Sequence, residues 1–414
     1  MDKITVYDSP MGSGKTEYAI QKLLGYSNDG EKRFIYITPY LSEVDRVCKR
    51  LKEEGIRFKQ PNNRNSKGSK LSSFSSLLMQ GENIVTTHAL FDRVDERALT
   101  FIRLNQYDLY LDEVFDVVSN FEDLTLEDFN MLLFNKKCRV LDNTRIEWLD
   151  DHYEGKFNQI KNLCNLGEMY FYSNKFFIYN FPIKVFNKMD KVNVFTFGFK
   201  GQIQYGYYKF YNKEMDFKMV YKENGIYKEK DYNREEVIKS FRKTMDLIHI
   251  YDGKMNFSKG DDRNISLSAT ALRRYCKEGK NSEELRLLRN MLGNYFRHHS
   301  KTSKSSDNLW TTLKSAKTYL KGNGYTKGFI SSNTRATNDY INRKACAYVY
   351  DKYFNPIQWN FLRSKGIQVD QNAFALVELL QLLFRGCIRK NQPMEVFIPS
   401  SRMRNLLENW EEYL

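Results

Sequence analysis

A glycine-rich loop near the start of this 414-residue chain has the residue types and spacing needed to bind a phosphate. Residues 9–16 read Ser-Pro-Met-Gly-Ser-Gly-Lys-Thr, after a β-branched strand pattern and before a helical one. Gly12 and Gly14 allow backbone N–H groups to turn toward a phosphate. Lys15 would reach the β- and γ-phosphates of a nucleotide, and the Thr16 hydroxyl would hold Mg²⁺. The order strand, loop, helix predicts a phosphate-binding loop, and an accidental glycine turn is the alternative.

Two adjacent carboxylates follow a second apolar strand pattern, at residues 107–111. In nucleotide hydrolysis, Asp112 could hold the Mg²⁺ shell, and Glu113 could orient and deprotonate the attacking water. Asp-Glu pairs are also common on protein surfaces. The apolar strand before the pair, downstream of a phosphate loop, favours the catalytic interpretation.

A third candidate group lies near the end of the chain, where an apolar helix pattern at residues 374–383 continues into Arg385 and Arg389. Residues four apart on a helix share a face, so both guanidinium groups could approach one phosphate. Gln381 precedes them on the same pattern. A basic helix face without a ligand is the alternative.

The composition favours a polyanionic partner. Lys and Arg number 65 against 51 Asp and Glu, which gives a formal charge of +14 and a pI of about 9.2; a solvated basic surface is the alternative. The six cysteines show no zinc-ligand spacing, so we expect reduced, mostly buried thiols. No apolar run approaches the ~18 residues of a membrane span, so we expect a cytoplasmic protein that does not contact membranes.

The remaining pattern predicts two domains, at residues 1–200 and 201–414. The second would carry a helical insertion at about 233–310. Residues 192–197 are interpreted as the last strand of the first domain. The aromatic and Lys-rich stretch 170–232, including the alternating segment 205–211, is interpreted as strands. A strand at 328–333 followed by a helix through residue 350 is predicted after the basic connector 297–308.

The ordered series of motifs resembles the superfamily 2 helicases of the DEAD/DEAH-like type. The first loop is similar to their Ala-Pro-Thr-Gly-Ser-Gly-Lys-Thr, with Ser9 where the general pattern has Gly. Thr-Pro at residues 38–39, Thr-Thr-His at 86–88 and Ala-Thr-Asn at 336–338 resemble motifs Ia, Ib and V. In the motif VI resemblance, Arg385 has the expected offset from Gln381, whereas Arg389 falls one residue later than in the family. The combination also looks like the replication helicases of bacteriophages and related mobile elements.

The resemblance implies an α/β fold of two RecA-like P-loop NTPase domains, with a β-rich aromatic middle region and helical insertions. It implies ATP and Mg²⁺ as cofactors and nucleic acid as partner, with single-stranded or forked DNA favoured over RNA, possible replication proteins, and the host cytoplasm as location. The candidate motif III, which links the nucleotide and nucleic-acid sites, is either Thr196 or residues 268–270. The implied site residues are, for catalysis, Lys15, Asp112, Glu113, Arg385 and Arg389; for the cofactor, Ser9, Gly12, Ser13, Gly14, Lys15, Thr16 and Gln381; for Mg²⁺, Thr16 and Asp112; and for nucleic acid, Thr38, Pro39, Thr87, His88, Thr337 and Asn338.

The predicted function is therefore an ATP-dependent nucleic-acid helicase. Two alternatives stay open at this point: a translocase that moves on duplex DNA without unwinding it, and a non-catalytic clamp that binds ATP as a structural ligand. A pure clamp would have no chemical need for Glu113.

Overall fold

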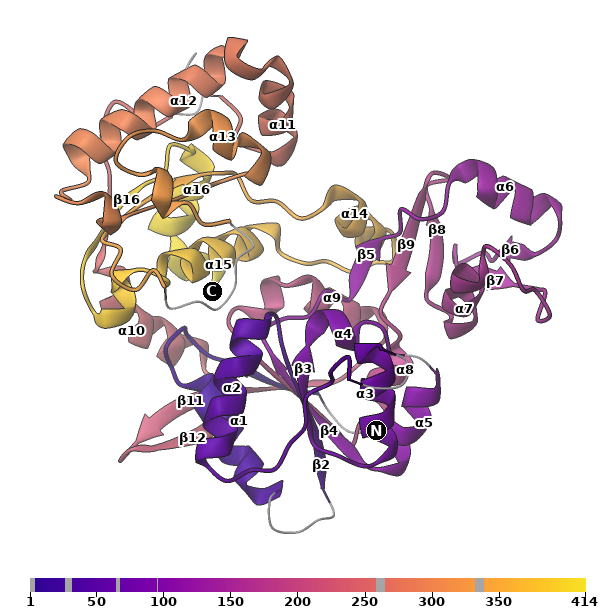
Figure 1. Ribbon diagram of the computed structural model, residues 1–414. Helices are drawn as coiled ribbons and strands as arrows, with labels where there is room; N and C mark the ends of the chain where they lie inside the picture. The colour runs from indigo at the N-terminus through magenta and orange to yellow at the C-terminus, as the bar shows by residue number, and fades with distance from the viewer. Residues whose placement is uncertain (1–3, 27–31, 65–67, 95, 258–264, 332–338) are drawn as a thin grey trace. The chain divides into compact units, whose positions relative to one another are not determined.

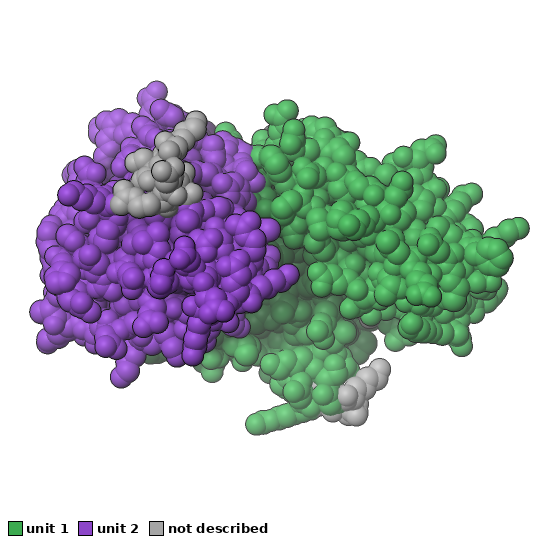
Figure 2. All heavy atoms as spheres, turned by 90° about the horizontal axis from the view of Figure 1, so that it is seen from above, with its two compact units in different colours: residues 1–7, 16–218, 354–369 green, residues 8–15, 219–353, 370–414 purple. Residues whose placement is uncertain are grey.

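A computed structural model of the chain describes residues 4–26, 32–64, 68–94, 96–257, 265–331 and 339–414. The chain divides into two compact units, coloured separately in Figure 2. Unit 1 contains residues 1–7, 16–218 and 354–369, and unit 2 contains residues 8–15, 219–353 and 370–414. Unit 1 therefore continues past residue 200, where we expected a boundary, and takes up a later segment of the chain.

The first sheet has seven strands in the order β12-β11-β1-β10-β4-β2-β3. The pairings β1–β11, β10–β4, β4–β2 and β2–β3 are all parallel. Strands such as β2 and β4 are buried along nearly their whole length, which explains why they appear in the sequence as continuous apolar runs. The strands are β1 Ile4–Asp8, β2 Arg33–Thr38, β3 Ile84–Thr87, β4 Tyr107–Asp112, β10 Lys191–Thr196, β11 Met215–Glu223 and β12 Ile226–Asp231. Because β11 pairs with β1 in this sheet, the prediction that β10 is the last strand of its domain is wrong.

Most helices of unit 1 lie between these parallel strands along the chain, and one belongs to the later segment 354–369. Helix α2 shows why such segments fold: Val44, Val47, Cys48 and Leu51 recur at helical spacing and are buried, and the helix contacts β2 and β3. The helices are α1 Lys15–Leu23, α2 Leu41–Glu53, α3 Lys70–Met79, α4 His88–Phe91, α5 Glu96–Leu104, α8 Ile183–Lys188, α9 Ile203–Phe210 and α14 Pro356–Ser364.

A small antiparallel module is inserted in unit 1 between β4 and β10. Its strands pair in the order β5-β9-β8, with a separate β6–β7 hairpin, and Figure 1 shows these elements grouped apart from the seven-stranded sheet. The module has its own apolar core, which includes Phe129, Trp148 and Met169. Its elements are β5 Val118–Asn120, α6 Leu126–Phe134, β6 Cys138–Val140, β7 Ile146–Trp148, α7 Asn158–Leu166, β8 Met169–Tyr172 and β9 Phe176–Asn180.

The aromatic segment 205–211 is mainly helix α9, not the strand that its alternating pattern predicted. Tyr207 and Tyr208 are fully buried, and a Cβ on Gly206 would lie 2.6 Å from Val369 Cγ2. The residues 354–369 therefore pack closely on this helix. Tertiary packing of large side chains overrides the local β propensity of tyrosine.

Unit 2 is built on a four-stranded sheet in the order β13-β16-β15-β14, with parallel pairing throughout. Its strands are β13 Ile248–Ile250, β14 Asn308–Thr312, β15 Ala345–Val349 and β16 Met394–Phe397. Its helices include α10 Arg234–Met245, α11 Ala269–Glu278, α12 Glu283–Asn294, α13 Lys317–Leu320, α15 Gln371–Leu383 and α16 Ser401–Glu408, which are labelled in Figure 1, and α17 Trp410–Tyr413. The two parallel sheets confirm the predicted α/β class.

Two local predictions in unit 2 are wrong. In place of a strand at 328–333, the described part of that segment forms a single bridge from Phe329 to Trp310. In place of a helix through residue 350, the chain forms the buried strand β15. Its Ala-Cys-Ala-Tyr-Val sequence completes the core between two neighbouring strands, so long-range pairing decides the conformation.

All six cysteines are free thiols, and five of them are buried, as the sequence predicted. Within the described ranges, no helix combines the length and apolar character needed to cross a bilayer.

Candidate functional site

The glycine loop connects β1 to α1, as the sequence predicted. Gly12 and Gly14 adopt φ values of +82° and +89°, in the region that side chains other than glycine enter at a cost. The Ser13 N–H donates to Pro10 O at 3.3 Å. The Ser13 Oγ atom is buried and has no hydrogen-bond partner among the described residues, so the loop presents an unused polar group.

Ser9 and Lys15 hold the loop together from within. The Ser9 hydroxyl accepts a hydrogen bond from Val220 N–H at 2.8 Å, across to the neighbouring strand β11. This contact explains why a serine, not the glycine of the general motif, occupies the first position. The Lys15 ammonium donates to Ser9 O at 2.6 Å and to Pro10 O at 3.0 Å.

An aromatic side chain that the sequence did not single out lies against the loop. A Cβ placed on Gly14 would be 2.0 Å from Tyr227 Cε1, on strand β12. A Cβ on Gly12, by contrast, would meet nothing within 4 Å. Two independent constraints therefore favour glycine at position 14: its backbone angle and the neighbouring Tyr227 ring. No spacing rule connects two residues so far apart in the chain.

The end of strand β4 meets the start of α1 inside unit 1. The Thr16 hydroxyl donates to Asp112 Oδ2 at 3.3 Å, joining residues 96 apart in sequence. Tyr36 on β2 donates to the same carboxylate oxygen at 3.2 Å. Because β2 and β4 pair in parallel, their side chains converge on this edge of the sheet.

Burial and charge perturb the Asp112 carboxyl group. It is only 7% exposed, and burial, together with the charge of Glu113, raises its pKa to about 6. The charge of Arg46 on α2 acts in the opposite direction. Arg46 in turn forms an ion pair with the buried Glu43. Both Tyr36 and this pair were missed from the sequence, although Glu43 lies in the motif Ia-like segment.

Glu113 occupies a strained backbone position beside Asp112. Its φ is +69°, and its N–H donates to Phe195 O at 2.9 Å. The Thr196 hydroxyl, at the end of β10, donates to Glu113 Oε2 at 3.3 Å. Non-glycine residues in this region cost of order 1–3 kcal/mol and concentrate at functional sites.

The two motif III candidates differ in their contacts. Thr196 contacts the Glu113 carboxylate, whereas the Ser268 hydroxyl accepts from Ala271 N–H and caps helix α11. The geometry therefore favours Thr196 as the residue coupled to the carboxylate pair.

The prediction that Arg385 and Arg389 share a helix face is wrong. Helix α15, which contains Gln381, ends at Leu383, and Arg389 lies in a separate 3₁₀ turn. Between them, a Cβ on Gly386 would lie 1.9 Å from Met394 Cε. This close approach favours glycine at a position beyond the end of the helix. Arg385 is buried and Arg389 is exposed.

The nucleic-acid candidates of unit 1 lie at the ends of β2 and β3. Thr38 is the register partner of Thr87 in this parallel pair, and Pro39 follows β2. Thr38 is buried and donates to Tyr40 O at 3.0 Å, while the His88 ring makes an edge contact with Phe115 at 5.4 Å. The motif V candidates Thr337 and Asn338 lie outside the described residues.

A glycine loop that joins a parallel strand to a helix, beside a strand-end carboxylate, defines an α/β protein of the P-loop class. Two protein-family models match parts of the chain: the YonV C-terminal Rossmann-like domain, over residues 242–411, and the YonV middle domain, over residues 118–179. The SPbeta prophage-derived uncharacterized protein YonV of Bacillus subtilis (strain 168) is 35% identical over 424 residues, covering 100% of this chain and 99% of the relative. The chain belongs to the YonV family.

Solved structures resemble the chain only distantly. Xpd4 of S. tokodaii is 10% identical with a TM-score of 0.47, over 99% of this chain and 94% of that one. The DUF1998 helicase MrfA, bound to DNA and AMPPNP, is 11% identical with a TM-score of 0.40 over 100% of this chain. The chain spans about half of the MrfA chain, 48%. At these scores we draw no argument about function from either structure.

Proposed function

We propose that the protein is an ATP-hydrolysing motor that moves on nucleic acid and separates its strands. One observation carries this proposal: the hydroxyl at the end of the glycine loop lies 3.3 Å from the strand-end carboxylate of Asp112. Two motifs far apart in sequence thus meet at the place where a P-loop enzyme needs a hydroxyl and a carboxylate.

The residues present fit a nucleotide and Mg²⁺. The positive φ angles of Gly12 and Gly14 would let the loop backbone turn toward a phosphate, and the Ser13 hydroxyl, which has no partner among the described residues, would add a donor. Thr16 and Asp112 supply the oxygen ligands that Mg²⁺ prefers. When bound, the ion would neutralise charge on the phosphates.

Each residue then has a defined task. Lys15 would exchange its bonds to loop carbonyls for the phosphates, and Glu113 would orient and deprotonate water, held in place by the Thr196 hydroxyl. Arg385 and Arg389 are proposed to offset charge on the transferred phosphate, with Gln381 nearby in sequence. The nucleic-acid track would contact the ends of β2 and β3. DNA is the favoured track, and replication of a phage or mobile element the favoured setting, because the 35% identical relative is prophage-derived.

The test is ATP turnover with and without single-stranded DNA or RNA, followed by unwinding of a forked duplex. We expect stimulation by one nucleic acid and loss of turnover in Lys15→Ala. Stimulated turnover without unwinding would instead identify a duplex translocase. Absence of turnover under every condition would favour an ATP-binding clamp, and full turnover by Lys15→Ala would refute the site.

A further inference from the structure

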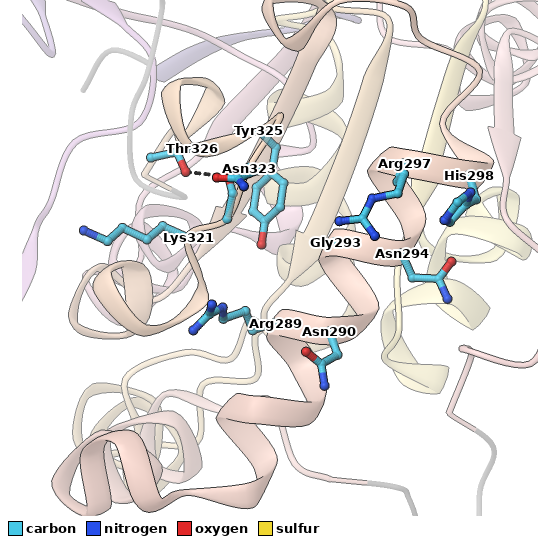
Figure 3. Close-up of a pocket in the computed structure, with 11 residues that line it drawn as sticks. Arg289, Asn290, Gly293, Asn294, Arg297, His298, Lys321, Asn323, Tyr325 and Thr326 are labelled. Atoms are coloured by element: carbon cyan, nitrogen blue, oxygen red, sulfur yellow. Dashed lines mark hydrogen bonds between the residues drawn. The ribbon is translucent and has the colours of Figure 1, made fainter.

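A basic pocket in unit 2 is not used by the proposed nucleotide chemistry. It has a volume of about 590 Å³. Figure 3 shows one wall formed by helix α12 and the π-helical turn Tyr295–His299, and a facing wall formed by residues 321–326. Four of its lining side chains are basic: Arg289, Arg297, His298 and Lys321.

The helical wall carries both of its arginines on one side. Arg289 and Arg297 are eight residues apart, a spacing that keeps two side chains on the same side of a helix. Arg297 lies in the π turn that ends this wall, and both arginines line the pocket. Gly293 between them has no side chain, and a Cβ there would meet nothing within 4 Å. The wall is therefore open between its two arginines.

The facing wall is held rigidly by Tyr325. This residue is only 1% exposed; its hydroxyl donates to Leu320 O at 2.7 Å, and its ring stacks on Phe296 at 4.8 Å. Asn308 donates to Gly324 O at 2.9 Å. Lys321 and the amide of Asn323 thus project from a segment fixed to the core of the unit.

The residues that line the pocket carry basic groups without acidic ones. No carboxylate lines it, and within the described ranges none of its four basic side chains forms an ion pair. On the same helix, by contrast, Arg286 pairs with Glu283 at 3.2 Å. The four side chains are exposed, so the Lys and Arg cations can reach the phosphates of a nucleic acid and release the counterions condensed on it.

We propose that this pocket binds the phosphate backbone of a nucleic acid. The two arginines are eight residues, or roughly two turns, apart along the helical wall. A chain of phosphates can neutralise cations spread over this length, whereas a single phosphate would leave some of them unmatched. Tyr325, the one aromatic residue in the lining, is 1% exposed and does not offer its ring to a base, so contacts would be to the backbone and independent of base sequence. The inference rests on the proposed nucleic-acid track and adds a second contact region to it, in unit 2.

The test compares the full chain with Arg289→Gln/Arg297→Gln by fluorescence anisotropy of labelled oligo(dT) and oligo(U) over a series of salt concentrations. Arg286→Gln is the matched control, because it removes an ion-paired arginine of the same helix outside the pocket. We expect the double variant to raise Kd about tenfold at moderate salt and to lower the salt slope by roughly 1.4, about 0.7 per lost single-strand contact. The control should leave both unchanged. Circular dichroism melting verifies that the variants fold.

Basal ATP turnover, measured in the same variants, separates the two proposals. If the wild-type chain binds the strand without hydrolysing ATP and the double variant loses binding, the pocket inference is supported and the proposed ATP-hydrolysing motor is refuted. If the double variant binds the strand as tightly as the control does, the pocket inference is overturned even when turnover is normal. The inference would also be overturned if inorganic phosphate or polyglutamate bound in the pocket and the oligonucleotides did not.

Discussion

Substituting the two glycines of the phosphate loop tests whether Tyr227 packs against it. Gly12 and Gly14 have nearly the same backbone angle, with φ of +82° and +89°. Only at Gly14 would a new Cβ meet a neighbour, with Tyr227 Cε1 at 2.0 Å and Cδ1 at 2.7 Å. The pair therefore separates backbone strain from steric overlap.

The expected magnitudes follow from these two terms. A Cβ in the left-handed region costs about 1–2 kcal/mol, and overpacking a well-packed position costs about 1–3 kcal/mol more. Gly12→Ala should therefore reduce the free energy of unfolding by about 1–2 kcal/mol, and Gly14→Ala by about 2–5 kcal/mol. The ring of Tyr227 is half-buried, with Lys222 Nζ 5.1 Å from its centroid, so moving it also disturbs its surroundings.

Urea unfolding of the single variants and of each glycine variant combined with Tyr227→Ala measures these terms. Removing the ring should recover about 1–3 kcal/mol in the Gly14→Ala background and nothing with Gly12→Ala. The reasoning is refuted if Gly14→Ala is no more destabilising than Gly12→Ala, or if Tyr227→Ala couples equally to both. The assay needs no nucleotide, so its result does not depend on the proposed function.

Two further predictions concern the carboxylate and the arginine turn. Burial raises the Asp112 pKa from 3.8 to about 6, so the native state binds this proton more tightly than the unfolded chain does. The ionised carboxylate therefore destabilises the native state by about 3 kcal/mol above about pH 6, and this cost disappears below about pH 3.8. In urea unfolding, the free energy of unfolding of Asp112→Asn should therefore rise relative to that of the wild type as pH rises through this window. Parallel pH profiles of the two proteins would contradict the raised pKa of Asp112. Gly386→Ala would place a Cβ 1.9 Å from Met394 Cε and 2.9 Å from Arg343 O, and should cost about 1–3 kcal/mol. Thermal unfolding should show only partial rescue by Met394→Ala, because the backbone oxygen remains; full rescue would show that the side chain alone causes the overlap.

The sequence was sufficient for the elements whose signals are local. The glycine loop and the apolar strand before Asp112 were placed correctly, because a positive φ requires glycine and a buried strand requires a run of apolar residues. The α/β class was implied by the resemblance that the ordered motifs carry, and the two parallel sheets confirm it.

Only the tertiary structure decided the features that depend on residues far apart in the chain. Helix α9 replaces a predicted strand because residues 354–369 cover it closely at Gly206. Strand β15 replaces a predicted helix because it pairs between two other strands.

The same physical reason governs the site. Thr16 and Asp112 were each chosen from their own motifs, but their contact exists only because the sheet brings the two strand ends together. Tyr227 had no local signal, since a side chain's neighbours across the fold leave no fixed spacing in the sequence. Glu43 and Arg46 are three residues apart on helix α2, and only the effect of Arg46 on Asp112 depends on the fold. Local residue types thus determined which chemistry was available, and long-range packing determined which side chains meet.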